Sequence, residues 1–484
     1  MKHARQITLL LLSALLLPLA AACGNEAATE QVTQGIGSST EGITETEEVR
    51  AQHAVPAELD FGGENFHVIN SVDFKKYHFA EEETGESMND AVYRRRMFVE
   101  ETLNVTLSHY EVDITKVYPE VSKTYRAGDD AYDFAMTHCI SGVSELVTNG
   151  FLYDYNELPY IDLNADWWNY EMMEQLQLGQ TLCYGFSDFQ IPNPYVIIFN
   201  RDMVTNFNLS NPYQLVYDGT WTLDNFITMC TTVVSDLDGD GKMTLNDNIG
   251  VGGVDGSLFS SFMTGAGQYV SQKGADGKVE IVINNERTYT IVEKMHSLME
   301  TPGAMWLAPG ELPNMASGRI LFYMGGVHFA ETMRDVDVEI GILPYPKLDE
   351  TQEKYMTLDW GGLTCVPGTI TNPEMVGAVL ELLAWDSANG VIPAYYDLTL
   401  AGKLARDDDC RNMLDLIFDT LVYDVGLNYF GFANGFNSML YTIHQLVINK
   451  KSADFASFYA KNEKSAQKTI DKFYEMLEST EGAT

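Results

Sequence analysis

Basic residues are scarce in this sequence of 484 residues. Lysine and arginine number 30 against 69 aspartates and glutamates, which gives a formal net charge of −39. Because nucleic-acid binding requires a basic surface that neutralises phosphates, this composition excludes that class of function. It also makes an anionic membrane surface an unfavourable partner for the folded body. The acidity is compatible with an extracellular protein and with a neutral or cationic ligand.

The signature motifs of several enzyme classes are also missing. The sequence contains no HExxH, no GxSxG and no P-loop. Its nine histidines show no metal-ligand spacing, and its six cysteines form no CxxC pair, so no zinc site is indicated. The widely spaced cysteines after residue 100 are expected to be small buried hydrophobes. Carboxylate pairs suited to glycoside hydrolysis arise by chance among so many acids, and nothing singles one out.

Long apolar runs are confined to the start of the chain. Lys2 and Arg5 precede an apolar stretch from Ile7 to Ala22, which predicts a secretory signal over residues 1–22. The stretch is shorter than the roughly 20 residues of a transmembrane helix. The segment that ends in Cys23 resembles a bacterial lipobox, which implies acylation of Cys23. The alternative is an ordinary signal peptide with Cys23 incidental.

A polar tether is predicted to follow the signal. Residues 23–57 are rich in Glu, Thr, Gly, Ser and Ala and contain no aromatic residue, so they bury too little apolar surface to offset their ordering entropy. We expect a flexible link between a lipid anchor on the extracellular face of the cell membrane and a soluble body. No later segment has 18 uninterrupted apolar residues.

Strand and helix patterns alternate through the rest of the chain. The alternation predicts an α/β protein with largely parallel sheets, and its length favours two lobes over one core. Asn89 is expected to cap a helix that stops at Asn104. The predicted strands are 66–70, 105–107, 132–137, 195–199, 320–324, 339–343 and 363–366, and further helices are predicted over 374–389, 410–425, 437–449 and 453–478.

Four local phrases, in this order, resemble the family 1, carbohydrate-type extracellular solute-binding proteins of bacterial ABC importers. The resemblance covers nearly the whole mature chain. The phrases are Glu81–Gly85 with Asn89–Arg95, Asn211–Val216 with Gly219–Thr222, Gly341–Lys347, and Arg406–Asp408 with Met413–Asp415 and Tyr423–Asp424.

The resemblance implies a two-lobed periplasmic-binding-protein type II fold with the ligand in the cleft between the lobes. Closure of the cleft by a hinge motion would present the loaded form to the permease subunits of an ABC transporter. We expect an N-terminal lobe of 58–183 plus 317–357 and a C-terminal lobe of 184–316 plus 358–484. The chain is expected to cross between them near 184–186 and near 355–361.

A neutral sugar or oligosaccharide is the predicted ligand, because aromatic rings complement the apolar faces of sugars and polar side chains bind their hydroxyls. Three alternatives stay open: a peptide or cationic solute as ligand, a tethered secreted carbohydrate-active enzyme, and a binding lipoprotein that serves a sensor or adhesion. The candidate ligand-binding residues are Trp360, Asp188, Phe189, His328, Trp306, Trp167, Tyr184 and Glu82. Any one of these tryptophans could equally be a core residue, and Trp221 is expected to be one.

The segment Asp236–Asp247 has the pattern of a calcium-binding loop. Asp236, Asp238 and Asp240 occupy positions 1, 3 and 5, and Gly241 allows the sharp turn at position 6. Lys242 would supply a backbone carbonyl, and Asp247 stands where a bidentate glutamate is usual. We predict a structural Ca²⁺ site here; the alternative is a solvated turn rich in Asp and Gly.

Overall fold

The structure is a computed structural model that describes residues 51–138, 141–253, 257–307, 315–333, 336–359, 361–400, 408–430, 443–449 and 451–481. The chain divides into two units, Met1–His53 and Ala54–Thr484, and the described helices and strands all lie in the second. Cys23 and the predicted signal lie outside the described residues. Among the described helices, none combines the length and the apolar character that a membrane span requires.

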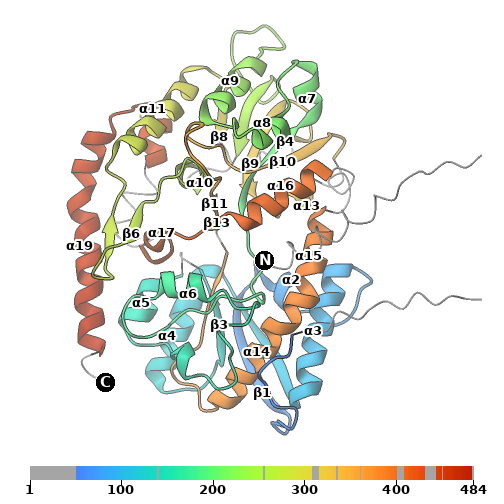
Figure 1. The fold of residues 1–484 in the computed structure, drawn as a ribbon, viewed down its shortest axis with the longest axis vertical. Helices are drawn as coiled ribbons and strands as arrows, with labels where there is room; N and C mark the ends of the chain where they lie inside the picture. Colours follow the sequence, from blue (N-terminus) through green and yellow to red (C-terminus); the bar gives the residue numbers. More distant parts are fainter. Residues whose placement is uncertain are drawn as a thin grey trace, which may run out of the picture. The chain divides into compact units, whose positions relative to one another are not determined.

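The first sheet of the second unit has the strand order β12-β3-β1-β2. Strand β1 (Glu64–Ser71) runs parallel to β2 (Val105–Val112) and to β3 (Phe134–Thr137), whereas β12 (Leu363–Cys365) is antiparallel to β3. The sheet occupies the lower half of Figure 1. The helices nearby are α2 (Lys75–His78), α3 (Ser87–Leu103), α4 (Val117–Ala127), α5 (Val143–Thr148), α6 (Tyr170–Leu176) and α14 (Pro373–Asn389).

Helix α3 confirms one of its two predicted ends. The helix stops at Asn104, which adopts the left-handed conformation at φ 49° and returns its N–H to Glu100, as expected for a C-terminal stop. The predicted start at Asn89 is wrong, because the helix begins two residues earlier without a side-chain cap. The Asn89 amide instead donates to the Glu82 carbonyl at 2.8 Å.

The second sheet has the order β10-β4-β9-β5-β8 and occupies the upper half of Figure 1. Strands β10 (Ile340–Leu343), β4 (Tyr195–Asn200) and β9 (Ile320–Gly326) pair in antiparallel fashion, and β5 (Ile249–Gly253) runs parallel to β9 and to β8 (Met305–Leu307). The sheets are therefore mixed rather than largely parallel. Trp221 packs fully buried on this sheet against Phe322 and donates its indole N–H to the Pro344 carbonyl at 2.9 Å, as its core assignment predicted.

The expected division into lobes is wrong for residues 317–357. Strands β9 and β10 lie in this segment, yet both pair with β4 of the second sheet. In the opposite sense, β12 pairs with β3 of the first sheet although it lies in 358–484, and α14 packs on α3. The reason is that antiparallel pairing joins strands far apart in the chain, and the sequence contains no marker of that register. The other lobe boundaries stay predictions.

Two adjacent segments connect the sheets. Gly185 donates its N–H to the Thr364 carbonyl at 2.8 Å, and a bridge joins Pro194 to Asp359. Between these points, Gln190 Nε2 donates to the Gly362 carbonyl at 3.2 Å. The crossing segments are therefore 185–194 and 359–364, close to the two positions expected from the sequence.

The remaining elements include a long helix near the C-terminus. The long helix α19 (Phe455–Glu481) packs against both α5 and α11, and it matches the prediction over 453–478. The helix predicted over 410–425 is confirmed as α16, but its predicted end is wrong, because α16 ends at Asp419 and a two-residue strand follows. Of the helix predicted over 437–449, residues 437–442 lie outside the described residues, and residues 443–449 are helical, with a π-helical turn over Gln445–Asn449. Cys183, Cys230, Cys365 and Cys410 are buried thiols, whereas Cys139 is not among the described residues.

The elements not yet given are α7 (Arg201–Asn206), α8 (Pro212–Tyr217), α9 (Leu223–Val233), α10 (Ser257–Gly265), β6 (Ser271–Lys273), β7 (Val279–Ile281), α11 (Glu286–Glu300), α13 (Phe329–Thr332), β11 (Thr357–Leu358), α15 (Val391–Leu400), α16 (Asp408–Asp419), β13 (Leu421–Val422), α17 (Val425–Phe430), the 3₁₀ turns η1 (Ile114–Lys116) and η2 (Tyr155–Glu157), and the π-helical turn η4 (Gln445–Asn449).

Candidate functional site

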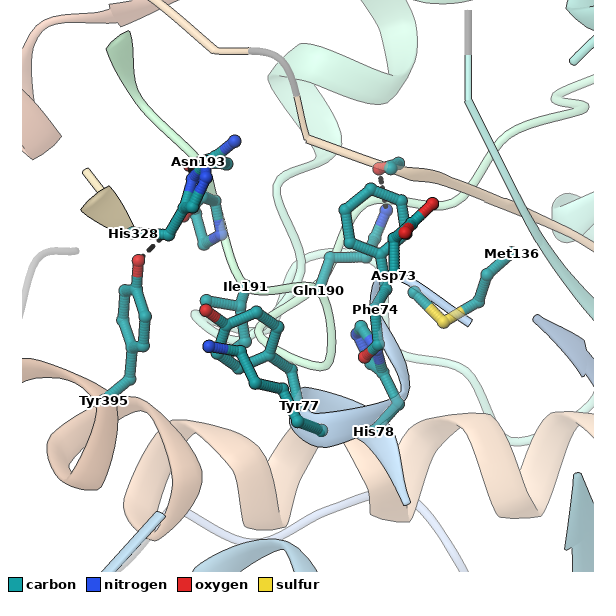
Figure 2. Close-up of a pocket in the computed structure, with 13 residues that line it drawn as sticks. Asp73, Phe74, Tyr77, His78, Met136, Gln190, Ile191, Asn193, His328 and Tyr395 are labelled. Carbon is teal, nitrogen blue, oxygen red and sulfur yellow. Dashed lines mark hydrogen bonds between the residues drawn. The ribbon is translucent and has the colours of Figure 1, made fainter. Parts of the chain in front are cut away.

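A pocket of about 350 Å³ lies between the two sheets. Its walls come from the segment after β1, from β3, from both crossing segments, from the turn after β9 and from α15 (Figure 2). The carboxyl ends of β1, β3 and β9 therefore point to it, which is the usual place for a ligand in an open α/β sheet. The lining residues are Asp73, Phe74, Lys76, Tyr77, His78, Met136, Gln190, Ile191, Pro192, Asn193, His328, Gly362 and Tyr395.

Helix α2 supplies one wall and is held in place from behind by Arg95. This side chain is fully buried on α3. Its guanidinium donates to the carbonyls of Tyr77 and His78 at 3.2 and 3.1 Å, and to Ser387 Oγ at 2.9 Å. Burial lowers the pKa of Arg95 to about 10, so the group stays charged at neutral pH. A four-residue helix is too short to be stable alone, and Arg95 provides it with buried anchoring bonds.

Phe189 also lies behind this wall. Its ring centroid is 4.6 Å from the Arg95 guanidinium and 4.9 Å from the His78 ring. The Phe189 side chain is buried and is not among the lining residues. The loop that contains Phe189 therefore supports α2. In place of the candidate Phe189, the neighbouring residues Gln190 and Ile191 line the pocket.

His78 is the most unusual polar group in the pocket. Its Nδ1 lies 2.8 Å from the Phe74 carbonyl, and because a carbonyl only accepts, Nδ1 carries the proton. Burial, together with the positive charge of Arg95, lowers the pKa of His78 to about 3, so the ring is neutral at physiological pH. Its Nε2 is buried and has no hydrogen-bond partner.

The opposite wall carries His328, one of the candidate ligand-binding residues; that it binds ligand stays a prediction. Its Nδ1 lies 2.9 Å from Asn193 Oδ1, which links the turn after β9 to the crossing segment. Gly326 makes this approach possible, because a Cβ at that position would lie 2.5 Å from Asn193 Oδ1. Tyr395 completes this side (Figure 2), with its hydroxyl 3.5 Å from the Pro192 carbonyl.

Two other candidate aromatic residues are core residues whose polar atoms are already bonded. Trp167 and its neighbour Trp168 donate their indole N–H groups to the two carboxylate oxygens of Glu381, at 3.1 and 2.8 Å. Tyr184 is buried and donates its hydroxyl to the Val143 carbonyl at 2.7 Å. These side chains hold the first lobe together and do not line the pocket, so the prediction of ligand contacts is corrected for Trp167 and Tyr184.

The other predicted site residues are dispersed. Asp188 lies in the loop beside Trp167, Trp306 lies on the edge strand β8, and Glu82 is exposed before α3. None of these three lines the pocket. Trp360, another candidate, lies outside the described residues.

The sequence reasoning missed Phe74, Tyr77, His78, Asn193 and Tyr395. The first three follow β1 directly, in the segment Phe74-Lys75-Lys76-Tyr77-His78. Their position in the sequence could have identified them, because residues just after a parallel strand lie at the carboxyl edge of the sheet, where ligands bind in open α/β folds. The candidate named from the segment after β1 was Glu82, which lies four residues beyond His78.

The predicted calcium loop forms a compact acidic turn. Asp236, Asp238 and Asp240 can place one carboxylate oxygen each within 4.8 Å of the others. Asp247 is not part of this group: its oxygens accept the N–H of Leu237 at 2.9 Å and the N–H of Thr244 at 2.7 Å, and it is buried. Gly239 and Gly241 adopt φ of 74° and 79°, which other residues rarely tolerate. Asp247 therefore closes the loop, whereas the three other aspartates face solvent or lie near it.

Comparison with known proteins shows the class of the fold. No family model and no curated protein matches the sequence. Among solved structures, the galacto-N-biose/lacto-N-biose I-binding protein of a Bifidobacterium longum ABC transporter, in complex with lacto-N-biose, matches with TM-score 0.60 at 12% identity, over 86% of this chain and 98% of that one. The cyclic α-maltosyl-1,6-maltose binding protein of Arthrobacter globiformis matches with TM-score 0.60 at 14% identity, over 85% and 100%. UgpB of Mycobacterium tuberculosis in complex with glycerophosphocholine matches with TM-score 0.56 at 13% identity, over 85% and 99%.

The fold is thus that of the two-lobed substrate-binding proteins of ABC transporters. This agrees with the resemblance found in the sequence and with the predicted type II architecture. At such low identity the likeness concerns the fold alone, so the ligand has to be argued from the pocket of this chain.

Proposed function

We propose that this protein is a cell-surface binding lipoprotein that captures a neutral sugar or oligosaccharide between its lobes and delivers it to the permease of an ABC importer. The observation that supports this most directly is the interlobe pocket. It combines the rings of Phe74, Tyr77 and Tyr395 with the side-chain amide of Asn193. Such a mixture of flat apolar surfaces and neutral hydrogen-bonding groups suits a sugar.

The charges in the pocket argue against the cationic and enzymatic alternatives. Asp73 is the single carboxylate among the described lining residues, and its side chain is exposed. A desolvated cation would require acidic partners, and Lys76 adds a positive charge instead. Glycoside hydrolysis normally uses two carboxylates across the bond that breaks, and the described lining does not contain such a pair.

A ligand panel tests the proposed function. The purified protein would be titrated calorimetrically with maltose, maltotetraose, lacto-N-biose, glycerophosphocholine, a tripeptide and spermidine, and each mixture would be checked for breakdown products. Binding of a saccharide without turnover would support the proposal. Binding of the peptide or spermidine alone would contradict the choice of ligand, and breakdown of a glycan would favour the enzyme.

Phe74→Ala is expected to weaken saccharide binding by about 1–2 kcal/mol, which is the scale of a lost aromatic contact. The ring lines the pocket and stacks beside His138 at 6.2 Å between centroids. Calorimetry on the best saccharide of the panel measures the loss. Tyr217→Ala is the control, because Tyr217 is an exposed aromatic on α8 that is not among the lining residues. Equal saccharide affinities of Phe74→Ala and Tyr217→Ala would show that the Phe74 ring does not contribute to binding.

Anchoring through Cys23 is part of the proposal. If Cys23 is acylated, Cys23→Ser should release the protein from the cell surface into the culture medium, and immunoblots of cell and medium fractions would show it. Retention on the cells would contradict the lipid anchor.

We also propose that the loop of Asp236, Asp238 and Asp240 binds Ca²⁺ as a structural ion. Three clustered carboxylates repel one another, and a divalent cation would offset that repulsion and stabilise the folded state by mass action. EDTA is expected to lower the melting temperature, and calcium to restore it. Asp238→Ala should abolish this response, whereas Asp276→Ala, at an acidic turn elsewhere, should keep it. A full EDTA response in Asp238→Ala would place the ion at another site.

A further inference from the structure

The inner end of the pocket contains polar groups whose hydrogen bonds are incomplete. His78 is 6% exposed, it lines the pocket, and its Nε2 has no partner. A buried acceptor without a partner lowers stability, and such groups in native proteins normally bond to water, an ion or a ligand.

Neighbouring strand ends show the same incompleteness. Asn70 near the end of β1 is fully buried, and neither its amide nitrogen nor its oxygen has a partner. Thr137 at the end of β3 is buried with its hydroxyl unpartnered. Met136 beside it lines the pocket, as does Gly362, whose Cβ position lies 3.2 Å from the Thr137 carbonyl. Of these three unsatisfied side chains, His78 lines the pocket, whereas Asn70 and Thr137 lie near the carboxyl ends of two adjacent parallel strands of the first sheet.

The bond between His78 Nδ1 and the Phe74 carbonyl decides what Nε2 can do. Because Nδ1 is the donor in that bond, Nε2 of the neutral ring carries a lone pair and can only accept. The ring cannot easily switch roles by rotation, because Phe189 contacts it at 4.9 Å and Tyr77 at 6.5 Å between centroids. The position therefore requires a partner that donates.

We propose that His78 Nε2 accepts a hydrogen bond from a free hydroxyl of the bound ligand and thereby selects neutral, unsubstituted sugars against phosphodiesters and acidic sugars. A phosphate or carboxylate offers only acceptors, and its negative charge would meet the lone pair of Nε2. An O-methyl group at the same place would leave Nε2 unsatisfied. A site built to bond a hydroxyl rejects an analogue that lacks it, because its own buried group then stays unpaired. This inference rests on the proposed function.

Two variants separate the roles of the ring nitrogens. In His78→Asn the side-chain amide can still donate to the Phe74 carbonyl, but the acceptor at Nε2 is lost. In His78→Gln the amide oxygen reaches the place of Nε2 and the Nδ1 bond is lost. We expect His78→Asn to bind the best saccharide of the panel about tenfold more weakly, the effect of about 1.4 kcal/mol, and His78→Gln to recover part of the affinity.

The ligand series completes the test. Wild type should bind the best saccharide of the panel at least tenfold more tightly than at least one of its mono-O-methyl derivatives, and His78→Asn should lose that preference. Nitrogen-15 NMR of the wild type should show His78 with the proton on Nδ1, and the Nε2 resonance should shift on saccharide addition. Equal saccharide affinity in His78→Asn, a proton on Nε2, or equal affinity for the saccharide and all its mono-O-methyl derivatives would overturn the role of His78 while leaving a binding protein. If no saccharide binds at all, both this inference and the proposed function are wrong.

Discussion

Arg95→Ala is expected to destabilise the protein by about 3–5 kcal/mol and to weaken ligand binding. The substitution removes a fully buried guanidinium that donates to the carbonyls of Tyr77 and His78 and to Ser387 Oγ. Alanine leaves these acceptors unsatisfied and leaves a cavity beside Phe189, and both effects cost stability. Because two of the three bonds hold α2, the pocket wall should loosen as well. Urea unfolding and calorimetric titration measure the two losses.

The adjacent residue on α3 is a matched control. Arg94 forms an ion pair with Glu83 at 2.7 Å, and the two side chains are 70% and 46% exposed. Such exposed pairs contribute little, so Arg94→Ala should change the unfolding free energy by less than about 1 kcal/mol. Should Arg95→Ala unfold with the same midpoint as Arg94→Ala, then Arg95 does not anchor α2. The milder Arg95→Lys keeps the charge but not the planar donor set, and it should fall between wild type and alanine.

Glu381→Ala is expected to cost about 3–4 kcal/mol without a comparable direct effect on ligand contacts. The Glu381 carboxylate is fully buried on α14 and accepts the indole N–H groups of Trp167 and Trp168. Burial raises the pKa of this carboxyl. Removing the carboxylate leaves two buried indole N–H donors without an acceptor, and this penalty is larger than the loss of the bonds themselves. The change in urea midpoint gives the effect.

A double-mutant cycle isolates the bond. Trp168→Phe alone should be costly because Glu381 Oε2 loses its 2.8 Å hydrogen bond and keeps the longer one from the Asp162 N–H at 3.3 Å, whereas the same change in the Glu381→Ala background should cost less. If the two substitutions have strictly additive effects on the unfolding free energy, the Trp168 indole contributes through packing and not through its hydrogen bond to Glu381. Ligand affinity should stay within about twofold of wild type in Glu381→Ala under conditions where the variant is folded, because none of these residues lines the pocket.

The sequence predicted the strands whose side chains are buried on both faces. Strand β4, with the run Tyr195–Asn200, and strand β9 were found because a short continuous apolar run rich in β-branched and aromatic residues is typical of a buried strand. It did not predict which sheet β9 and β10 join. That depends on antiparallel pairing with β4, and a pairing between strands more than 100 residues apart leaves no local pattern.

The site was predicted less well, for two physical reasons. Trp167 satisfied the expectation of a sugar platform by residue type, but its partner Glu381 is 214 residues away in the sequence, and the contact exists only in the folded chain. Phe74 and Tyr77 were missed because α2 has a single turn and shows no periodicity. His328 was a candidate because of its position in the family that the sequence resembles, and it lies shortly after strand β9.

The crossing segments constrain how this protein can change its ligand. Gln190 and Asn193 line the pocket, and they also tie the two segments together, through Gly362 and through the 2.7 Å bond from the Asn193 N–H to Asp359. A substitution at Gln190 reshapes the pocket and also removes a side-chain bond between the two crossing segments. Under the proposed function, it would therefore alter the free-energy difference between open and closed forms as well as ligand affinity. A new specificity that arises through Gln190 would then shift transport competence at the same time. Changes at Phe74, which lies outside both crossing segments, would leave selectivity and closure free to diverge.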